Sequence, residues 1–104
     1  MIRNVLIVDD DRDLLLMSKE GLAPYDHIFS VLTAGDGQLA VETLQKNPVS
    51  LVLTDLKMPR MDGFTLLAHV MEHYPDIPVL VMTGFGTPAL ERKASTNGAL
   101  EYIQ

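Results

Sequence analysis

Short apolar runs recur at regular intervals along this 104-residue chain, and they constrain its fold more than any other feature. Three of the five runs are continuous rather than alternating, which is typical of parallel strands buried on both faces. The runs are Val5–Val8, Ile28–Ala34, Leu51–Thr54, Val79–Thr83 and a weaker one at Leu100–Ile103. Each is predicted to be a strand.

The stretches between these runs are predicted to be helices. Arg12–Leu22 follows acidic residues that suit the helix dipole, and Asp36 is a candidate N-cap for Gly37–Lys46. A third helix is predicted from an apolar stripe at i, i+3, i+4 and i+7: Phe64, Leu67, Ala68 and Met71. Pro88 suits the first turn of a fourth helix over Ala89–Thr96. Alternating strands and helices predict an α/β fold, with a parallel sheet and helices on both faces.

Composition excludes several classes of function. The net charge of -6 disfavours nucleic-acid binding, because nothing would neutralise the phosphates. The absence of cysteine excludes disulfides, thiolate metal sites and a cysteine nucleophile. The apolar runs of about five residues are far shorter than the roughly 20 that a membrane span needs. A cytoplasmic protein with one domain is therefore the simplest interpretation.

Polar residues follow three of the predicted strands. Asp9 and Asp10 end the first strand, Asp55 ends the third and Thr83 ends the fourth. Sites in open parallel sheets form at the carboxyl ends of the strands, so these oxygens are expected to meet at one edge. Oxygen ligands favour Mg²⁺ or Mn²⁺, and a spare aspartate beside such an ion could be a nucleophile toward phosphorus. Spacing alone leaves open the alternative that the acids only serve a solvated helix N-terminus.

The segments "VLIVDDD", "LVLTDLKMPRMDGFTLL", "VLVMTGFG" and "GALEYI" resemble the receiver domain of two-component response regulators. The resemblance is collinear from Val5 to Ile103, and the block from Asp55 to Gly63 is its most specific part. It implies a doubly wound, flavodoxin-like sheet of five parallel strands in the order 2-1-3-4-5. It also implies a phosphoacceptor switch with self-catalysed phosphotransfer and dephosphorylation, rather than an enzyme.

The resemblance assigns roles to individual residues. Asp55 matches the aspartate that becomes phosphorylated. A Mg²⁺ ion would be held by Asp9, Asp10, Asp55 and the backbone carbonyl of Lys57, with Asp9 acting largely through water. Thr83 matches the switch hydroxyl that bonds the new phosphoryl group, and Tyr102 matches the aromatic switch on the last strand. Lys57 and Phe85 lie two residues beyond Asp55 and Thr83, and from that position we expect them to flank an attacking water and so to set the lifetime of the phosphoryl group.

The implied phosphodonor is a phosphohistidine on a sensor histidine kinase or a phosphotransfer protein. The output domain or partner protein is not specified, neither nucleic acid nor membrane is an expected partner, and a second copy of the chain is a further candidate. The family carries a lysine just after the last strand, and here it would follow Gln104. Residues 1–104 are therefore expected to form one receiver domain without that lysine and without the final helix.

Two competing interpretations remain open at this stage. The D-x-D in "VLIVDDD" also fits a haloacid dehalogenase-like phosphatase, with Asp9 as nucleophile and Asp11 as general acid. The residue that carries the phosphoryl group, Asp55 or Asp9, would discriminate between the two. The other interpretation is an inert interaction domain that binds metal but is not phosphorylated.

Three weaker motifs have simpler explanations. Residues 9–20 match the acidic positions of an EF-hand loop, but Leu14 stands where that loop needs glycine. His69 to His73 fits the H-x-x-E-H pattern of zinc peptidases, although surface histidines on an exposed helix are the favoured interpretation. Gly84 to Ala89 fits G-x-G-x-x-A but comes too late in the chain for a dinucleotide fold.

Overall fold

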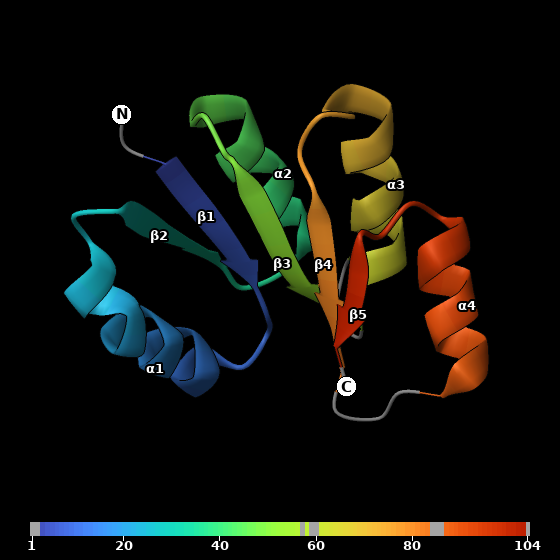
Figure 1. Cartoon of the computed structure of the whole chain (residues 1–104), viewed down its shortest axis with the longest axis horizontal. Coiled ribbons are helices and arrows are strands. Elements are labelled where there is room, and N and C mark those ends of the chain that lie inside the picture. Colours follow the sequence, from blue (N-terminus) through green and yellow to red (C-terminus); the bar gives the residue numbers. More distant parts are fainter. Residues whose placement is uncertain (1–2, 57, 59–60, 84–86, 104) are drawn as a thin grey trace.

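Strands and helices alternate along the whole chain (Figure 1), in a computed structural model that describes residues 3–56, 58, 61–83 and 87–103. The elements are β1 (Arg3–Val8), α1 (Arg12–Leu22), the 3₁₀ turn η1 (Ala23–Tyr25), β2 (Phe29–Ala34), α2 (Gly37–Lys46), β3 (Leu51–Asp55), α3 (Gly63–His73), β4 (Val79–Met82), α4 (Pro88–Thr96) and β5 (Glu101–Ile103). All the strand pairs are parallel, and the strand order is β2-β1-β3-β4-β5. The predicted doubly wound, flavodoxin-like architecture is confirmed.

The register of the sheet brings the carboxyl ends of its central strands to one edge. Val8 of β1 lies opposite Thr54 of β3, and Asp55 lies opposite Met82 of β4. The residues that follow Val8 and Met82, and the end of β3 itself, therefore lie side by side. This edge is where the sequence predicts the functional site.

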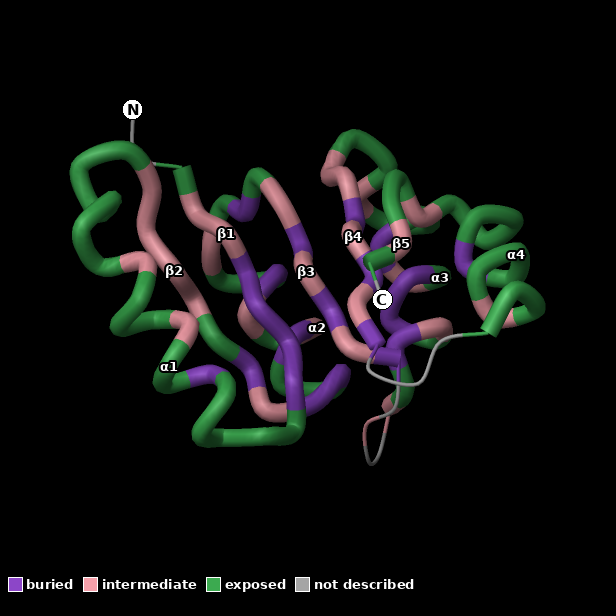
Figure 2. The backbone as a smooth tube through the Cα atoms, turned by 60° about the horizontal axis from the view of Figure 1, so that its bottom comes forward, coloured by how far each residue is buried: buried purple, intermediate pink, exposed green. Residues whose placement is uncertain are grey.

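The two faces of the sheet are buried to different extents. On one face the side chains of Val52, Thr54, Val79 and Val81 are fully buried or nearly so, and they join the core with α2, α3 and α4. The intervening residues of β3 and β4 point to the other face and are only half-buried. Figure 1 shows α1 on this second face, and Figure 2 shows the buried segments gathered in the centre of the sheet. The face that α1 covers is thus the more open one.

Side-chain caps define where the helices begin. Asp11 accepts hydrogen bonds from the backbone N–H groups of Asp13 and Leu14, and Asp36 accepts one from Leu39 at 2.9 Å. Asp62 and Thr87 cap α3 and α4 in the same way. Each cap satisfies a backbone donor that the helix leaves unpaired and is worth about 1 kcal/mol. The predicted N-cap at Asp36 is confirmed.

The buried stripe of α3 differs by one position from the predicted one. Its buried residues are Gly63, Leu66, Leu67 and Val70, whereas Ala68 and Met71 are exposed and Phe64 is half-buried. The start of the helix explains the difference. The N–H of Gly63 donates to the carbonyl of Leu56 at 2.9 Å, and a Cβ on Gly63 would collide with the carbonyl oxygen of Asp55. This close approach sets the rotation of α3 about its axis, a tertiary contact that periodicity does not report.

Among the described residues, no helix is both long enough and apolar enough to cross a membrane. Two site residues expected from the sequence fall outside the described ranges. These are Lys57 and Phe85, the latter within the glycine-rich segment 84–86, and the structure gives no placement for either.

Candidate functional site

Three carboxylates meet at the carboxyl edge of the sheet. Asp9 and Asp10 follow β1, Asp55 ends β3, and one carboxylate oxygen from each lies within 4.8 Å of the others. The three differ in access to solvent: Asp9 is 5% exposed, Asp55 is half-buried and Asp10 is open. The convergence predicted from the sequence is therefore present. Asp9 forms its buried side and Asp10 its exposed side.

Backbone hydrogen bonds orient the two inner carboxylates. The N–H of Asp11 donates to Asp9 Oδ1 at 2.9 Å, and the N–H of Leu56 donates to Asp55 Oδ1 at 2.7 Å. The backbone N–H of Asp9 donates in turn to the carbonyl of Ala34 on β2 at 3.1 Å. Both acids are thereby held by the main chain of the sheet edge, which limits how far they can move apart.

Burial and mutual repulsion make the charged form of Asp9 energetically unfavourable in this cluster. Burial raises the pKa of Asp9 above its ordinary value, and the hydrogen bond from the N–H of Asp11 lowers it in part. The neighbouring carboxylates of Asp55 and Asp10 raise the pKa of Asp9 further, because like charges disfavour one another. A cation placed among the three carboxylates would favour their charged forms. Its positive charge would offset both the cost of burying Asp9 and the repulsion between the carboxylates.

The donor set fits a hard divalent cation. Carboxylate oxygens are the ligands that Mg²⁺ prefers, and this ion usually keeps several waters while binding one or two carboxylates. Asp10 is exposed, so water can reach this side of the cluster. The receiver domains that the sequence resembles bind Mg²⁺ at an acidic pocket of this kind.

Thr83 and Tyr102 lie next to this edge on the following strands. Thr83 is 7% exposed, and its N–H donates to the carbonyl of Ile103 at 3.0 Å, which continues the pairing of β4 with β5. Tyr102 lies opposite Val81 and faces the side of the sheet that α2, α3 and α4 cover. Its hydroxyl is enclosed and has no hydrogen-bond partner among the described residues. A buried hydroxyl without a partner costs about 1 to 3 kcal/mol, so among the described residues only packing holds Tyr102 in its inward position.

The contacts by which two further residues support Asp55 were not predicted from the sequence. Thr54 is fully buried directly before Asp55, and its hydroxyl donates to the Asp55 carbonyl at 2.9 Å. Gly63 lets α3 begin against that same carbonyl. A threonine in an apolar strand and a glycine at a helix start were visible in the sequence. Their contacts with Asp55 depend on the distance between β3 and α3, which the sequence does not report.

In the described part of the chain, the residues of the phosphatase, EF-hand and zinc-peptidase patterns do not come together as complete sites. Asp11, the general acid of the phosphatase interpretation, instead caps α1 and is exposed. Asp13 and Glu20 are also exposed and lie outside the three-carboxylate group, so the EF-hand positions do not converge. His69 and His73 do come together on α3, with ring centroids 4.5 Å apart, but the described residues provide no third metal ligand beside them.

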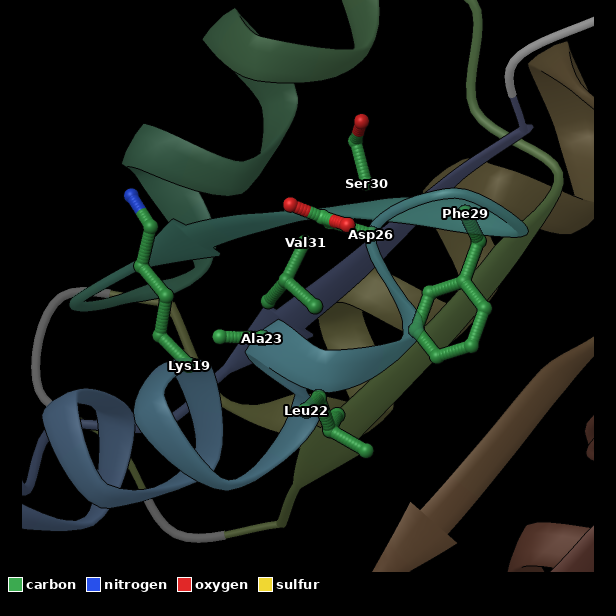
Figure 3. Close-up of a pocket in the computed structure, with 7 residues that line it drawn as sticks. All are labelled: Lys19, Leu22, Ala23, Asp26, Phe29, Ser30 and Val31. Atoms are coloured by element: carbon green, nitrogen blue, oxygen red, sulfur yellow. The ribbon is translucent and has the colours of Figure 1, made fainter.

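A surface pocket of about 310 Å³ lies between α1, η1 and β2 (Figure 3). Its lining mixes apolar groups with one amine, one carboxylate and one hydroxyl. The lining residues are Lys19, Leu22, Ala23, Asp26, Phe29, Ser30 and Val31. None of them belongs to the carboxylate cluster, and the pocket opens beside the first half of β2 rather than at the carboxyl edge. It is therefore separate from the site at Asp55.

Comparison with known proteins agrees with this geometry. The family profile described as "Response regulator receiver domain" matches residues 5–104. The response regulator protein FleR of Pseudomonas aeruginosa is 36% identical over 99% of this chain and 21% of its own length. A probable cyclic di-GMP phosphodiesterase of Vibrio cholerae is 35% identical over 95% of this chain and 22% of its own length. The chain thus spans about a fifth of these relatives.

A solved structure extends the likeness to three dimensions. The chemotaxis protein CheY4 of Vibrio cholerae superposes with a TM-score of 0.90 at 28% identity, over 98% of this chain and 85% of that one. The fold, the collinear motifs and the family profile lead to one conclusion. The chain belongs to the response regulator receiver domain family, whose members act as switches in two-component signalling.

Proposed function

We propose that Asp55 accepts a phosphoryl group with the help of Mg²⁺ and that this modification switches a partner or output surface. The observation that carries the proposal is the convergence of Asp9, Asp10 and Asp55, whose oxygens lie within 4.8 Å of one another at the sheet edge. Phosphoryl acceptance is general to the receiver family to which the chain belongs. The haloacid dehalogenase-like alternative has less support, because Asp11 is occupied as the cap of α1.

The proposed step is a transfer between two proteins. An oxygen of the Asp55 carboxylate attacks phosphorus, the P–N bond of a phosphohistidine breaks, and the released imidazole keeps the bonding electron pair. Asp9, Asp10 and Asp55 would hold the metal, together with the Lys57 carbonyl that the family resemblance implies. Bound there, Mg²⁺ would offset the negative charge that gathers between carboxylate and phosphoryl oxygens. The N–H of Leu56 holds the attacking carboxylate in place.

The product would act on Thr83 and Tyr102. An aspartyl phosphate adds negative charge and strong acceptor oxygens at the edge, so a nearby hydroxyl gains a charge-assisted hydrogen bond. Movement of Thr83 toward Asp55 would change the space beside Tyr102. The enclosed hydroxyl of Tyr102 has no hydrogen-bond partner among the described residues, so its movement would break no hydrogen bond to them.

The proposed partners follow from the chemistry. A sensor histidine kinase or a phosphotransfer protein would donate the phosphoryl group, which implies a cytoplasmic meeting place. The relatives named here are longer proteins of differing function, so the receiver is proposed to control whichever output is joined to it or docks on it.

The test is to map the modified residue. The protein is incubated with a small-molecule acyl or amido phosphate, with and without Mg²⁺, and the adduct is trapped with borohydride and located by mass spectrometry. We expect one metal-dependent adduct on Asp55, lost in Asp55→Asn and kept in Asp26→Asn as the exposed matched control. An adduct on Asp9 that survives Asp55→Asn would favour the phosphatase. Metal binding with no adduct would favour an inert interaction domain.

A further inference from the structure

His69 and His73 form a second cluster of potential metal ligands. They lie on α3, the helix whose first residue, Gly63, packs against Asp55. The two residues are one turn apart on α3, and their ring centroids are separated by 4.5 Å with the ring planes tilted by 43°. His73 is 54% exposed, whereas His69 is half-buried and lies 6.2 Å from the ring of Tyr74. One ring is therefore anchored against the protein and the other is open to solvent.

The ring spacing suits a shared metal ion. A metal–nitrogen bond of about 2.0 to 2.1 Å places an imidazole centroid about 3.2 Å from the ion. Two such bonds separate the centroids by about 4.5 Å when they meet at 90°, as in tetragonal Cu²⁺ sites, and by about 5.2 Å at the tetrahedral angle of Zn²⁺. The observed 4.5 Å equals the 90° value and is about 0.7 Å shorter than the tetrahedral one, a difference that side-chain rotation can supply. Residues i and i+4 face the same side of a helix, so the backbone already holds the pair in position.

The charges around the pair favour a cation. Burial lowers the pKa of His69, and the neighbouring His73 lowers it further, although Glu72 opposes them. The neutral form of imidazole is the one that binds metals. The carboxylate of Glu72 lies 3.9 Å from His73 Nε2 and adds negative charge beside the site.

The pair is well separated from the acidic cluster. The N-terminal end of α3 begins against Asp55, and the histidines occupy its second half. Eleven residues at about 1.5 Å each give a helix about 16 Å long. Nitrogen ligands also select different ions, since imidazole suits Zn²⁺ and Cu²⁺ whereas carboxylates suit Mg²⁺.

We propose that His69 and His73 chelate one borderline divalent transition metal ion, Zn²⁺ or Cu²⁺, through two imidazole nitrogens at the C-terminal end of α3. Water completes the coordination sphere. The ion bridges the last turn of the helix, where the N–H of Tyr74 donates to the Val70 carbonyl at 2.7 Å, and so stabilises that end of α3. This is a binding site distinct from the proposed Mg²⁺ site, and it has no peptidase chemistry because no third protein ligand accompanies it in the described residues.

The test titrates the whole 104-residue chain with Zn²⁺ by calorimetry and with Cu²⁺ by tyrosine fluorescence, both in excess Mg²⁺ to occupy the carboxylates. Loss of an outer-sphere partner of a metal ligand costs about 10- to 100-fold in affinity, so loss of a ligand itself should cost at least about tenfold. We expect that loss in His69→Gln and in His73→Gln. His27→Gln, the third histidine of the chain, is the matched control and should bind as the wild type does.

Fluorescence locates the ion independently of affinity. Cu²⁺ should quench Tyr74 most, because its ring is 6.2 Å from that of His69, and Tyr74→Phe should remove most of the quenching while leaving the Zn²⁺ affinity unchanged. The proposal is overturned if His69→Gln and His73→Gln both keep wild-type affinity, or if His27→Gln weakens binding equally. It is also overturned if the Asp10→Asn/Asp55→Asn double variant, rather than the histidine variants, abolishes binding.

Discussion

The acidic cluster and the histidine pair are two candidate metal sites of opposite construction. The acids come from the ends of two neighbouring strands and include one carboxylate that is 5% exposed. The histidines come from one turn of α3, and one ring is 54% exposed. The comparison shows that a ligand cluster assembled by tertiary structure can be buried and electrostatically unfavourable until an ion binds. A cluster assembled by helix periodicity is exposed and nearly unstrained.

Because of this difference, we expect metal binding at the acidic site to depend more on the rest of the fold than metal binding at the histidine pair. The acidic site relies on the pairing of β1 with β3 and on the start of α3 against Asp55. The histidine site needs only the second half of α3 to be helical. Changes that separate these requirements should affect one site and spare the other.

The largest effect is expected from Asp10→Ala. Removing this open ligand should lower the Mg²⁺ affinity by about 10- to 100-fold or more, while Zn²⁺ binding at His69 and His73 stays unchanged. NMR shift titration with each ion measures both. Asp11→Ala is the control, since its side chain caps α1 and should affect stability rather than Mg²⁺ affinity. Equal losses in Asp10→Ala and Asp11→Ala would mean a diffuse acidic surface instead of a site.

A second prediction concerns the contact between α3 and β3. Gly63→Ala should lower the free energy of unfolding by about 1 to 3 kcal/mol, because its Cβ would collide with the backbone at Asp55 and Leu56. It should weaken Mg²⁺ binding more than Zn²⁺ binding, since the strain falls beside Asp55. Urea unfolding and the two titrations measure these effects.

The matched control for that prediction is another helical glycine. A Cβ on Gly21 of α1 would meet no atom within 4 Å, so Gly21→Ala should raise stability by up to about 1 kcal/mol. If both substitutions changed stability alike, close packing at Gly63 would not be the cause.

The third prediction uses the charge of Asp9. Its pKa is raised in the folded state, so folding favours the protonated form, and that contribution is lost as the pH rises through the folded pKa. At neutral pH without metal, Asp9→Asn should therefore melt at a higher temperature than the wild type, and the difference should shrink below the ordinary aspartate pKa. The amide oxygen can still accept the Asp11 N–H.

Excess Mg²⁺ should reverse that order, because an ion that binds the folded state stabilises the wild type and binds the variant less. Thermal melts at several pH values, with and without Mg²⁺, make the comparison. A wild type that is more stable than Asp9→Asn at neutral pH without metal would contradict the repulsion described here.

The smallest effect is expected from Glu72→Gln. Exposed ion pairs contribute about 0.2 to 1 kcal/mol, so Zn²⁺ affinity at the histidine pair should fall by no more than about fivefold and Mg²⁺ affinity should not change. Calorimetry measures both ions. Glu42→Gln, at an exposed position on α2, is the matched control. A loss as large as that of His73→Gln would make Glu72 a direct ligand.

By itself, the sequence determined the elements with local causes. Hydrophobic runs predicted the strands to within a few residues, and Asp36 predicted the start of α2, because periodicity and capping act between neighbours in the chain. The same local rule makes His69 and His73 a pair, although the sequence alone favoured unrelated surface histidines. The parallel α/β class followed from the alternation of these elements.

Only the tertiary structure decided how the elements meet. The burial of Asp9 and the raised pKa of its carboxyl group depend on the spacing of β1, β3, β4 and β5, and so does the hydroxyl of Tyr102, which is unpaired among the residues that the structure describes. The rotation of α3, which moved its buried stripe to Gly63, Leu66, Leu67 and Val70, depends on one close contact with Asp55. The physical reason is that desolvation, repulsion and steric fit arise between groups that are distant in the chain, and their strength is set by separations that only the packed fold defines.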